Sequence, residues 1–536
     1  MHEDQFPLHL RAPFPTLGRK MVAVSDHPVV SRAACKVVDA GGNAVDAAVA
    51  MSFMLGCCCP YYAGLGGGGF ALVWMPGWPA PRWLDYRECA PARAHPEFYV
   101  DRPEDASYEG VHAVGVPGTV AGLFELHSQF GALPWAQVVA PAIERARKGL
   151  KIDPNWHRIS LAKEAMILRH PEMTRLYLPD GASPFPGDRL HFPDLGQTLE
   201  ALAGEGPEVF YRGYLAERMV AACPDWLTAD DLSSYRPRWR QPLSMEWDRG
   251  HLYTVGAPSA GGLQLLQILG LMERQDRRDE NFYHALAESM RITFRERGHS
   301  CGDPEFGAPD LRPHLSNEWF EGWARRLDKK APLALSGPAV SYGDGGTASH
   351  GVATREGGVV IITESVNHWF GSMVVPSQCG FVLNNTMDDF TTHPGRPDGF
   401  HIAPSALNRV EAGKRPVSSS CPCVLMVDGR PQVIAGSAGG PRITTSVAQI
   451  MLQRRWRAHN IQQAVSASRI HHQWYPDHVE VEPLVPETVR AILRDRGHQV
   501  MEFYCRSHAA ALECHWDEGF FSGGADYRSF GGAWAD

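Results

Sequence analysis

Residues 343–363 read GDGGTASHGVATREGGVVIIT and separate two parts of the chain that differ in character. A glycine-rich stretch leads into Thr347, and the β-branched run at 359–363 is typical of a buried strand. Comparable short apolar runs, bounded by glycine, proline or asparagine, follow at residues 381–383, 423–426 and 433–435. The last third of the chain is therefore predicted to form a strand-rich sheet.

Helical patterns flank these predicted strands. Within residues 29–59, Gly41 and Gly42 end one alanine-rich helix, and Asn43 can cap the next. Further helical patterns occupy residues 115–150, 284–297, 444–456 and 486–497. Helices before and after a set of strands favour an α+β fold in which layers of helix enclose stacked sheets.

A glycine loop at residues 64–69 reads GLGGGG and formally matches GxGxxG. The dinucleotide-binding fingerprint requires a strand before the glycines and a helix after them. Here the predicted order is helix, glycines, strand, so no helix N-terminus is available for a pyrophosphate. A tight turn with close backbone packing explains the glycines better, and a Rossmann oxidoreductase is disfavoured.

Length and composition exclude several classes of protein. The chain has 536 residues, which suggests one large elaborated domain or two to four smaller ones. Its 51 basic and 60 acidic residues give a net charge of −9, which disfavours binding to nucleic acid. No run of 18 apolar residues is found, so no membrane-spanning helix is expected. The first 20 residues lack the apolar core of a secretory signal, and a cytoplasmic location is expected.

The cysteines and histidines follow no pattern of a metal site. The 12 cysteines include Cys57, Cys58 and Cys59 in a row, which rarely suits a disulfide framework, and no CxxC pair of zinc spacing occurs. Reduced thiols are therefore expected. The 24 histidines include no HExxH motif.

Polar and glycine-rich clusters follow the predicted strands. They lie at residues 365–367, 384–390, 418–420 and 436–440. Binding and catalytic residues are often found at such strand ends. On the residues alone, however, a threonine after two glycines, such as Thr347, is more often an ordinary loop residue.

Ordered blocks along nearly the whole chain resemble the gamma-glutamyltransferase family, whose members are also called gamma-glutamyl transpeptidases or glutathione hydrolases. The blocks are GGNAVDAAVA (41–50), GLGGGGF (64–70), DYRECAPARA (85–94), GVPGTVAG (115–122), PSAGG (258–262), GDPEF (302–306), GGT (345–347), FVLNNTMDDF (381–390), GKRPVSSSCP (413–422), GSAGGPRITT (436–445) and GGADYR (523–528).

The resemblance implies an N-terminal-nucleophile hydrolase with an αββα sandwich formed jointly by two autoprocessed fragments. The cut would fall between Gly346 and Thr347. It would give a helix-rich large subunit, 1–346, with the substrate carboxylate site, and a strand-rich small subunit, 347–536, with an N-terminal threonine. A threonine hydroxyl needs a base, and an α-amine with a pKa near 7.7–8.0 is a better base at neutral pH than a lysine. Cleavage would thus create the nucleophile and a nearby base in one residue.

The resemblance also implies the residues that hold the substrate. Arg87, Ser418 and Ser419 match the groups that bind its α-carboxylate, a bidentate task suited to a guanidinium. Asn367 and Asp389 match the groups that hold the α-ammonium. Without the family, Arg87 is more simply a surface ion-pair residue and Asp389 a helix cap or turn residue.

Three further residues match the catalytic machinery. Gly439 and Gly440 match the glycine pair whose backbone N–H groups form an oxyanion hole, and Ser365 matches a hydroxyl that touches the nucleophile. Without the family, the glycine pair is more simply a turn. All reacting groups are supplied by the chain, so no metal or organic cofactor is implied.

The sequence departs from the family pattern at several positions. The usual Thr-Thr-His start becomes Thr347, Ala348 and Ser349, and Thr386 replaces a Glu or Gln that contacts the ammonium in many members. Trp369 is expected to narrow the pocket.

The resemblance also implies a lid over the site. Residues 391–412 have a length compatible with the family's lid loop, and Phe400 lies where a gating aromatic residue can sit.

These observations predict a self-processing threonine amidohydrolase or transferase that cleaves gamma-glutamyl amides, such as glutathione, through a gamma-glutamyl-enzyme ester. One alternative is a cytoplasmic relative that hydrolyses a different small amide, oxamate-like or otherwise acylated, with the same threonine. Another is a catalytically silent binding homologue. The two fragments are expected to form a heterodimer. Its further dimerisation, the physiological acceptor and the balance of hydrolysis and transfer are left open.

Overall fold

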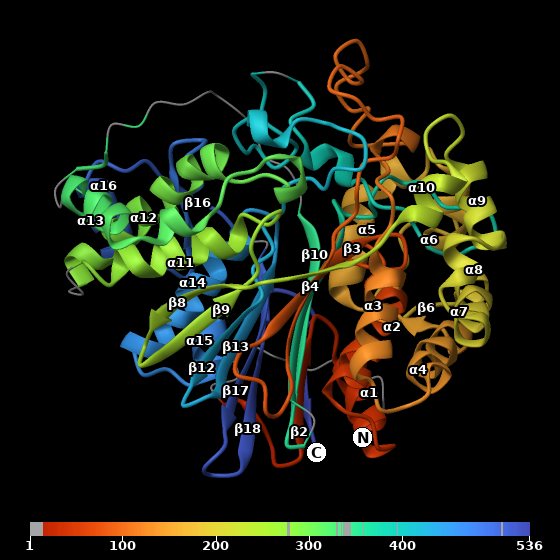
Figure 1. Cartoon of the computed structure of the whole chain (residues 1–536), viewed down its shortest axis with the longest axis horizontal. Helices are drawn as coiled ribbons and strands as arrows, with labels where there is room; N and C mark the ends of the chain where they lie inside the picture. The colour runs from red at the N-terminus through yellow and green to blue at the C-terminus, as the bar shows by residue number, and fades with distance from the viewer. Residues whose placement is uncertain are drawn as a thin grey trace.

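The computed structural model describes residues 14–275, 279–327, 331–333, 335, 345–356, 358–393, 395–504 and 507–536. Two seven-stranded sheets run through the middle of this part of the chain, with helices on both sides (Figure 1). Every strand pair within these two sheets is antiparallel. The predicted α+β class is confirmed at the level of a mixed fold, and the structure adds that both large sheets are antiparallel.

The first sheet carries the stretch around Thr347 in its centre. In spatial order its strands are β19 (Gly532–Ala535), β2 (Met21–Ser25), β10 (Gly346–Thr354), β11 (Gly358–Asn367), β3 (Gly68–Trp74), β4 (Arg82–Tyr86) and β7 (Arg238–Arg240). Every residue of β10 and β11 is buried, because both faces of the sheet are covered.

The second sheet lies against the first. In spatial order its strands are β1 (Thr16–Gly18), β18 (Phe520–Ala525), β17 (His508–His515), β13 (Arg430–Ala438), β12 (Cys423–Val427), β9 (Gly250–Thr254) and β8 (Leu243–Trp247). An apolar cluster that includes Phe70, Leu72, Ile361, Ile434 and Leu512 fills the space between the two sheets.

Helices from the first half of the chain cover the outer face of the first sheet (Figure 1). The main ones are α1 (Pro28–Asp39), α2 (Ala44–Cys58), α3 (Thr119–Phe130), α4 (Trp135–Lys148), α5 (Pro154–Ile167) and α7 (Pro193–Glu205). Asn43 caps α2 in a capping box with Asp46, as its sequence predicts. The helix is apolar on all sides and almost wholly buried, so it lies directly on the sheet.

A second group of helices covers the second sheet. It comprises α11 (Gly261–Met272), α12 (Asp279–Ser300), α14 (Arg442–Trp456), α15 (Ile461–Ser466) and α16 (Glu487–Asp495). The helices predicted at 284–297, 444–456 and 486–497 correspond to α12, α14 and α16. Among the described residues, no helix combines the length and the apolar composition needed to cross a bilayer.

One predicted strand is wrong and one predicted connection is confirmed. Residues 381–383 form no strand. Leu383 makes a single bridge to Gly66, and its N–H donates to the carbonyl of Val374, because this apolar run packs between loops and helices rather than at a sheet edge.

The glycine loop at 64–69 does connect a helix, α2, to a strand, β3, in the order that argues against a dinucleotide site.

Candidate active site

A break in the pairing of β10 with β11 lies directly in front of Thr347. The two strands pair regularly from Ala348 opposite Glu364 to Thr354 opposite Gly358, but Gly346 lies opposite Asn367. One extra residue on β11 therefore makes a bulge, and Asn367 has a φ of 80°. The bulge takes the peptide between Gly346 and Thr347 out of the regular ladder.

Ser365 contacts both sides of this peptide. Its Oγ donates to the carbonyl oxygen of Gly346 and lies 3.3 Å from Oγ1 of Thr347. The backbone N–H of Asn367 donates to the same Oγ at 2.7 Å and fixes its position. A carbonyl that accepts an O–H bond is more electrophilic at carbon, so this contact polarises the Gly346 carbonyl.

Gly439 and Gly440 lie between the end of β13 and the start of α14, with φ values of 118° and 58°. These conformations favour glycine. A Cβ placed on Gly345 would stand 2.7 Å from the backbone nitrogen of Gly440. The glycine pair therefore adjoins the chain immediately before Thr347.

Thr347 opens into a small cavity. It is lined by Arg87, Arg297, Thr347, Ser365, Asn367, Asp389, Asp398, Phe400, Val417, Ser418, Ser419, Ser420, Gly440 and Ile443. All five predicted substrate-binding residues are in this set, together with Thr347, Ser365 and Gly440. Residues from both halves of the chain, separated by up to about 350 positions, thus meet at one place.

The cavity contains a buried ion pair. Arg87 donates to Asp389 and lies 3.3 Å from the carboxylate of Glu88. Burial opposes the charge of Arg87, but the neighbouring carboxylates keep its pKa above the ordinary value. Burial also raises the pKa of Asp389, and that of Glu88 to about 7. Arg87 is a cation held by buried acids, and not the surface ion-pair residue of the alternative interpretation.

Three serines and a second arginine form another wall. Arg297, from α12, donates to Oγ of Ser419 at 2.5 Å, and the Oγ of Ser418 accepts from the backbone N–H of Ser420 at 3.1 Å. Burial lowers the pKa of Arg297. Arg297 is not among the predicted site residues, because nothing in the helical pattern at 284–297 distinguishes it from the other residues there.

Phe400 covers the cavity from the loop at 391–412. Its ring stacks on His368 with centroids 4.3 Å apart, and a Cβ on Gly440 would touch it at 2.8 Å. His368 is held in turn by Asp388, whose carboxylate lies 2.9 Å from Nε2. The aromatic residue suspected from the length of the loop does lie over the cavity.

Comparison with known proteins gives the family of this chain. A sequence model described as gamma-glutamyltranspeptidase matches residues 30–535. A glutathione hydrolase proenzyme of Pseudomonas aeruginosa is 35% identical over 480 residues, which cover 86% of this chain and 84% of the relative. The corresponding proenzyme of Escherichia coli is 30% identical over 504 residues, 91% of this chain and 87% of the relative.

The chain belongs to the gamma-glutamyltranspeptidase family. The predicted family and its chemistry, gamma-glutamyl amide cleavage by a self-processing hydrolase, are confirmed.

Solved structures agree with this assignment. The gamma-glutamyltranspeptidase of Pseudomonas nitroreducens complexed with L-DON is 31% identical, with a TM-score of 0.54 over 57% of this chain and 94% of that one. A cephalosporin acylase from Bacillus halodurans has a TM-score of 0.88 over 100% of this chain and 99% of that one. It is 24% identical, so the likeness concerns the fold alone.

This gamma-glutamyltranspeptidase homologue departs from the family pattern at Ala348, Ser349 and Thr386. None of these three residues lines the cavity. Ala348 is buried in the core beneath the helices of the first sheet, and the hydroxyl of Ser349 donates to the carbonyl of Ile362 at 3.2 Å. Thr386 packs its methyl group against Gly115. The replacements after Thr347 therefore leave the cavity wall unchanged.

Trp369 does not narrow the pocket, and that prediction is wrong. It is 3% exposed and packs in the core of the first helix layer, where the guanidinium of Arg158 lies 5.4 Å from its ring. The chain reverses at Phe370, with a φ of 62°, so that Trp369 points into the core while His368 supports Phe400.

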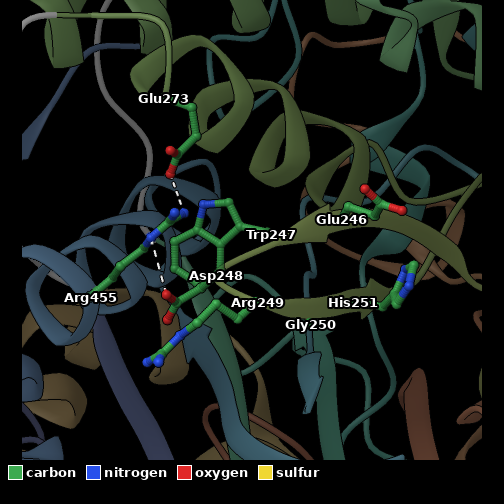
Figure 2. Close-up of a pocket in the computed structure, with 8 residues that line it drawn as sticks. All are labelled: Glu246, Trp247, Asp248, Arg249, Gly250, His251, Glu273 and Arg455. Atoms are coloured by element: carbon green, nitrogen blue, oxygen red, sulfur yellow. Dashed lines mark hydrogen bonds and ion pairs between the residues drawn. The ribbon is translucent and has the colours of Figure 1, made fainter. Parts of the chain in front are cut away.

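A second hollow, at the turn between β8 and β9, contains none of the predicted site residues (Figure 2). Arg455 lies over the ring of Trp247 at 4.8 Å, lies 3.2 Å from Asp248 and pairs with Glu273. The charged groups of Arg455, Asp248 and Glu273 therefore pair with one another, and these contacts hold the turn against α14 and the end of α11.

Proposed function

We propose that this chain cuts itself between Gly346 and Thr347, and that the new N-terminal Thr347 cleaves gamma-glutamyl amides. Residues 1–346 and 347–536 would then form jointly a four-layer αββα sandwich. The observation that carries the proposal is the single cavity in which Thr347 meets Arg87, Asp389, Ser418 and Ser419.

In the cleavage step, Oγ1 of Thr347 attacks the carbonyl carbon of Gly346. The C–N bond breaks, the threonine nitrogen takes up a proton to become the free α-amine, and an ester links Gly346 to Thr347. Water then hydrolyses the ester and leaves the carboxylate on Gly346. The Ser365 hydroxyl on the Gly346 oxygen supports this step.

In the mature enzyme, the α-amine of Thr347 takes the proton of its own hydroxyl. The oxygen attacks the gamma-carbonyl of the substrate, the leaving amine takes a proton, and a gamma-glutamyl ester forms. Backbone N–H groups of Gly439 and Gly440 would stabilise the oxyanion. Water, or an amine acceptor, then releases the glutamyl group.

The charges in the cavity favour a zwitterionic head group. Arg87 suits an α-carboxylate, and Asp389 suits an α-ammonium beside it. Asp389 pairs with Arg87 in this structure, and a substrate carboxylate that binds Arg87 would compete for that guanidinium. The α-ammonium of a gamma-glutamyl group would then compensate Asp389, whereas an oxamate-like amide has no ammonium to do so. This observation favours a gamma-glutamyl substrate, with glutathione as the first to test.

The test is intact-mass measurement followed by a substrate screen. We expect fragments of 346 and 190 residues from the 536-residue chain, and turnover of gamma-glutamyl-p-nitroanilide and glutathione. Thr347→Ala should remain uncut and inactive. Turnover of oxamate-like amides alone would replace the proposed substrate, and a single uncut, inactive wild-type chain would support a silent homologue.

We further propose that the two fragments stay together as a heterodimer and that the enzyme acts in the cytoplasm. Cell fractionation with an antibody against the native protein tests the location.

A further inference from the structure

We propose that Asp398, on the loop that carries Phe400, is a substrate-binding residue whose carboxylate contacts the α-ammonium of the gamma-glutamyl group. The inference rests on the proposed function and adds a residue to it. If it holds, recognition of the ammonium is coupled to placing Phe400 over Gly440.

The first observation is that the ammonium end of the cavity lacks one acceptor. Thr386 is not part of the cavity wall and packs against Gly115 instead. Asn367 lines the cavity and donates its amide N–H to the carbonyl of Asn385 at 3.1 Å, which leaves Oδ1 as its acceptor atom. An ammonium has three N–H donors, and Asn367 and Asp389 supply two acceptors.

The second observation is that Asp398 is the other carboxylate in the wall of the cavity. Its Oδ1 accepts from the backbone N–H groups of Phe400 at 3.0 Å and Ile402 at 2.9 Å. These two bonds fix the carboxylate on its own loop. Among the described residues, Oδ2 has no hydrogen-bond partner, and it remains available to a ligand.

The third observation is that, in the part of the chain that the structure describes, Asp398 forms no ion pair. Burial and the charge of Asp389 raise its pKa to about 8, and the backbone bond from Ile402 and the charge of Arg297 only partly oppose them. Among the described residues, Arg297 donates to Ser419 rather than to Asp398, and Arg87 donates to Asp389. A carboxyl group in this position is stabilised in its charged form when a cation enters the cavity.

The loop couples the contact of Asp398 with the ammonium to the position of Phe400 over the cavity. Asp398 and Phe400 are two residues apart and share the hydrogen bond at Oδ1, while Gln473 donates to the carbonyl of Phe400 at 3.1 Å. An ammonium that draws Asp398 inward therefore also holds the Phe400 ring on His368 and above Gly440.

The test compares substrates with and without the α-ammonium. Asp398→Asn keeps the acceptor for the two loop N–H groups but removes the charge. For the mature enzyme, we expect kcat/KM on gamma-glutamyl-p-nitroanilide to fall about 10- to 100-fold, the loss typical of one hydrogen bond to a charged group. On glutaryl-p-nitroanilide, which lacks only the amine, the change should stay within about threefold. Asp398→Asn should likewise raise the inhibition constant of L-glutamate, which carries the α-ammonium, and should leave the inhibition constant of glutarate nearly unchanged.

Arg396→Gln is the matched control, because Arg396 is an exposed residue of the same loop, pairs with Glu104 and lies outside the cavity lining. It should leave both substrates unchanged. If Asp398→Asn lowers kcat/KM equally on both substrates, Asp398 has a role in loop structure alone. If kcat/KM falls on neither substrate, Asp398 does not take part in binding. Either result overturns the inference while the proposed function stands. A wild-type enzyme inactive on gamma-glutamyl-p-nitroanilide overturns both.

Discussion

Glu364 and Ser365 are neighbours on β11 with opposite surroundings. Ser365 lines the cavity, whereas Glu364 is 1% exposed near His350 of β10 and Ser52 of α2. Burial raises the pKa of Glu364 to about 8 and lowers that of His350 to about 4. Both groups are therefore mostly uncharged at pH 7, directly behind the strand that carries the serine.

This burial predicts a pH-dependent stability. The pKa of Glu364 is about 8 in the folded protein, against a usual value of 4.5, so its contribution to stability is fully present below pH 4.5 and is lost as the pH rises to about 8. Glu364→Gln removes the ionisation and should raise the free energy of unfolding, relative to wild type, by roughly 2 kcal/mol at pH 8. Thermal unfolding at pH 5 and pH 8 measures this.

The stability gain should shrink towards pH 5, where the wild-type carboxyl group is protonated in the fold. Glu518→Gln, at an exposed position, should show no such difference. A Glu364→Gln protein whose stability relative to wild type is the same at both pH values would contradict the neutral state of Glu364.

Three chain segments build the reacting centre: the start of β10, the end of β11 and the turn between β13 and α14. The bulge between β10 and β11 exposes the Gly346–Thr347 peptide, and the β13–α14 turn brings Gly439 and Gly440 beside Gly345. Each segment is short, and each is fixed by backbone contacts that a side chain would disturb.

Gly345→Ala should slow self-cleavage. The new Cβ would stand 2.7 Å from the nitrogen of Gly440 and 2.8 Å from the carbonyl carbon of Gly439, and neither backbone atom can move aside at low cost. We expect the rate of cleavage to fall at least about tenfold. Quantifying cut and uncut chains over time on denaturing gels measures it.

Once cut, Gly345→Ala enzyme should have the wild-type kcat, because Gly345 is then no longer joined to Thr347. Gly322→Ala is the control, since nothing lies within 4 Å of a Cβ at that position. Cleavage of Gly345→Ala at the wild-type rate would show that the glycine pair does not assist the first step.

Both large sheets contain strands from either side of Gly346. In the first sheet, β10 and β11 lie between β2 and β3, and in the second sheet β12 pairs with β9. Cutting the chain at Gly346 therefore breaks one peptide bond but no strand pairing along these edges.

The cut enzyme is accordingly expected to remain one particle. Both fragments should elute together on size-exclusion chromatography, at the volume of the uncut Thr347→Ala chain, and should separate only in denaturant. The fragment 347–536 expressed alone should be unfolded, because its strands would expose apolar faces and unpaired edges. Separate elution of the fragments from the native enzyme would contradict the shared sheets.

Local sequence determined much of this protein. Short apolar and β-branched runs specified β11, β12 and β13, and helical periodicity and the Asn43 cap specified helices. Ordered motifs identified the family together with Thr347, Arg87 and Gly440. These features depend on residues close together in the chain. The apolar run at 381–383 was misread as a strand because nothing in its own composition shows that it has no neighbouring edge to pair with.

Tertiary structure alone decided which further side chains reach the cavity. Arg297 and Asp398 belong to a helix and a loop that meet Thr347 only after both sheets have stacked, and Trp369 turns into the core because the chain reverses at Phe370. Such placements depend on contacts between segments distant in sequence. The physical reason is that the direction of a side chain follows from the packing of the elements around it, which no short stretch of residues contains.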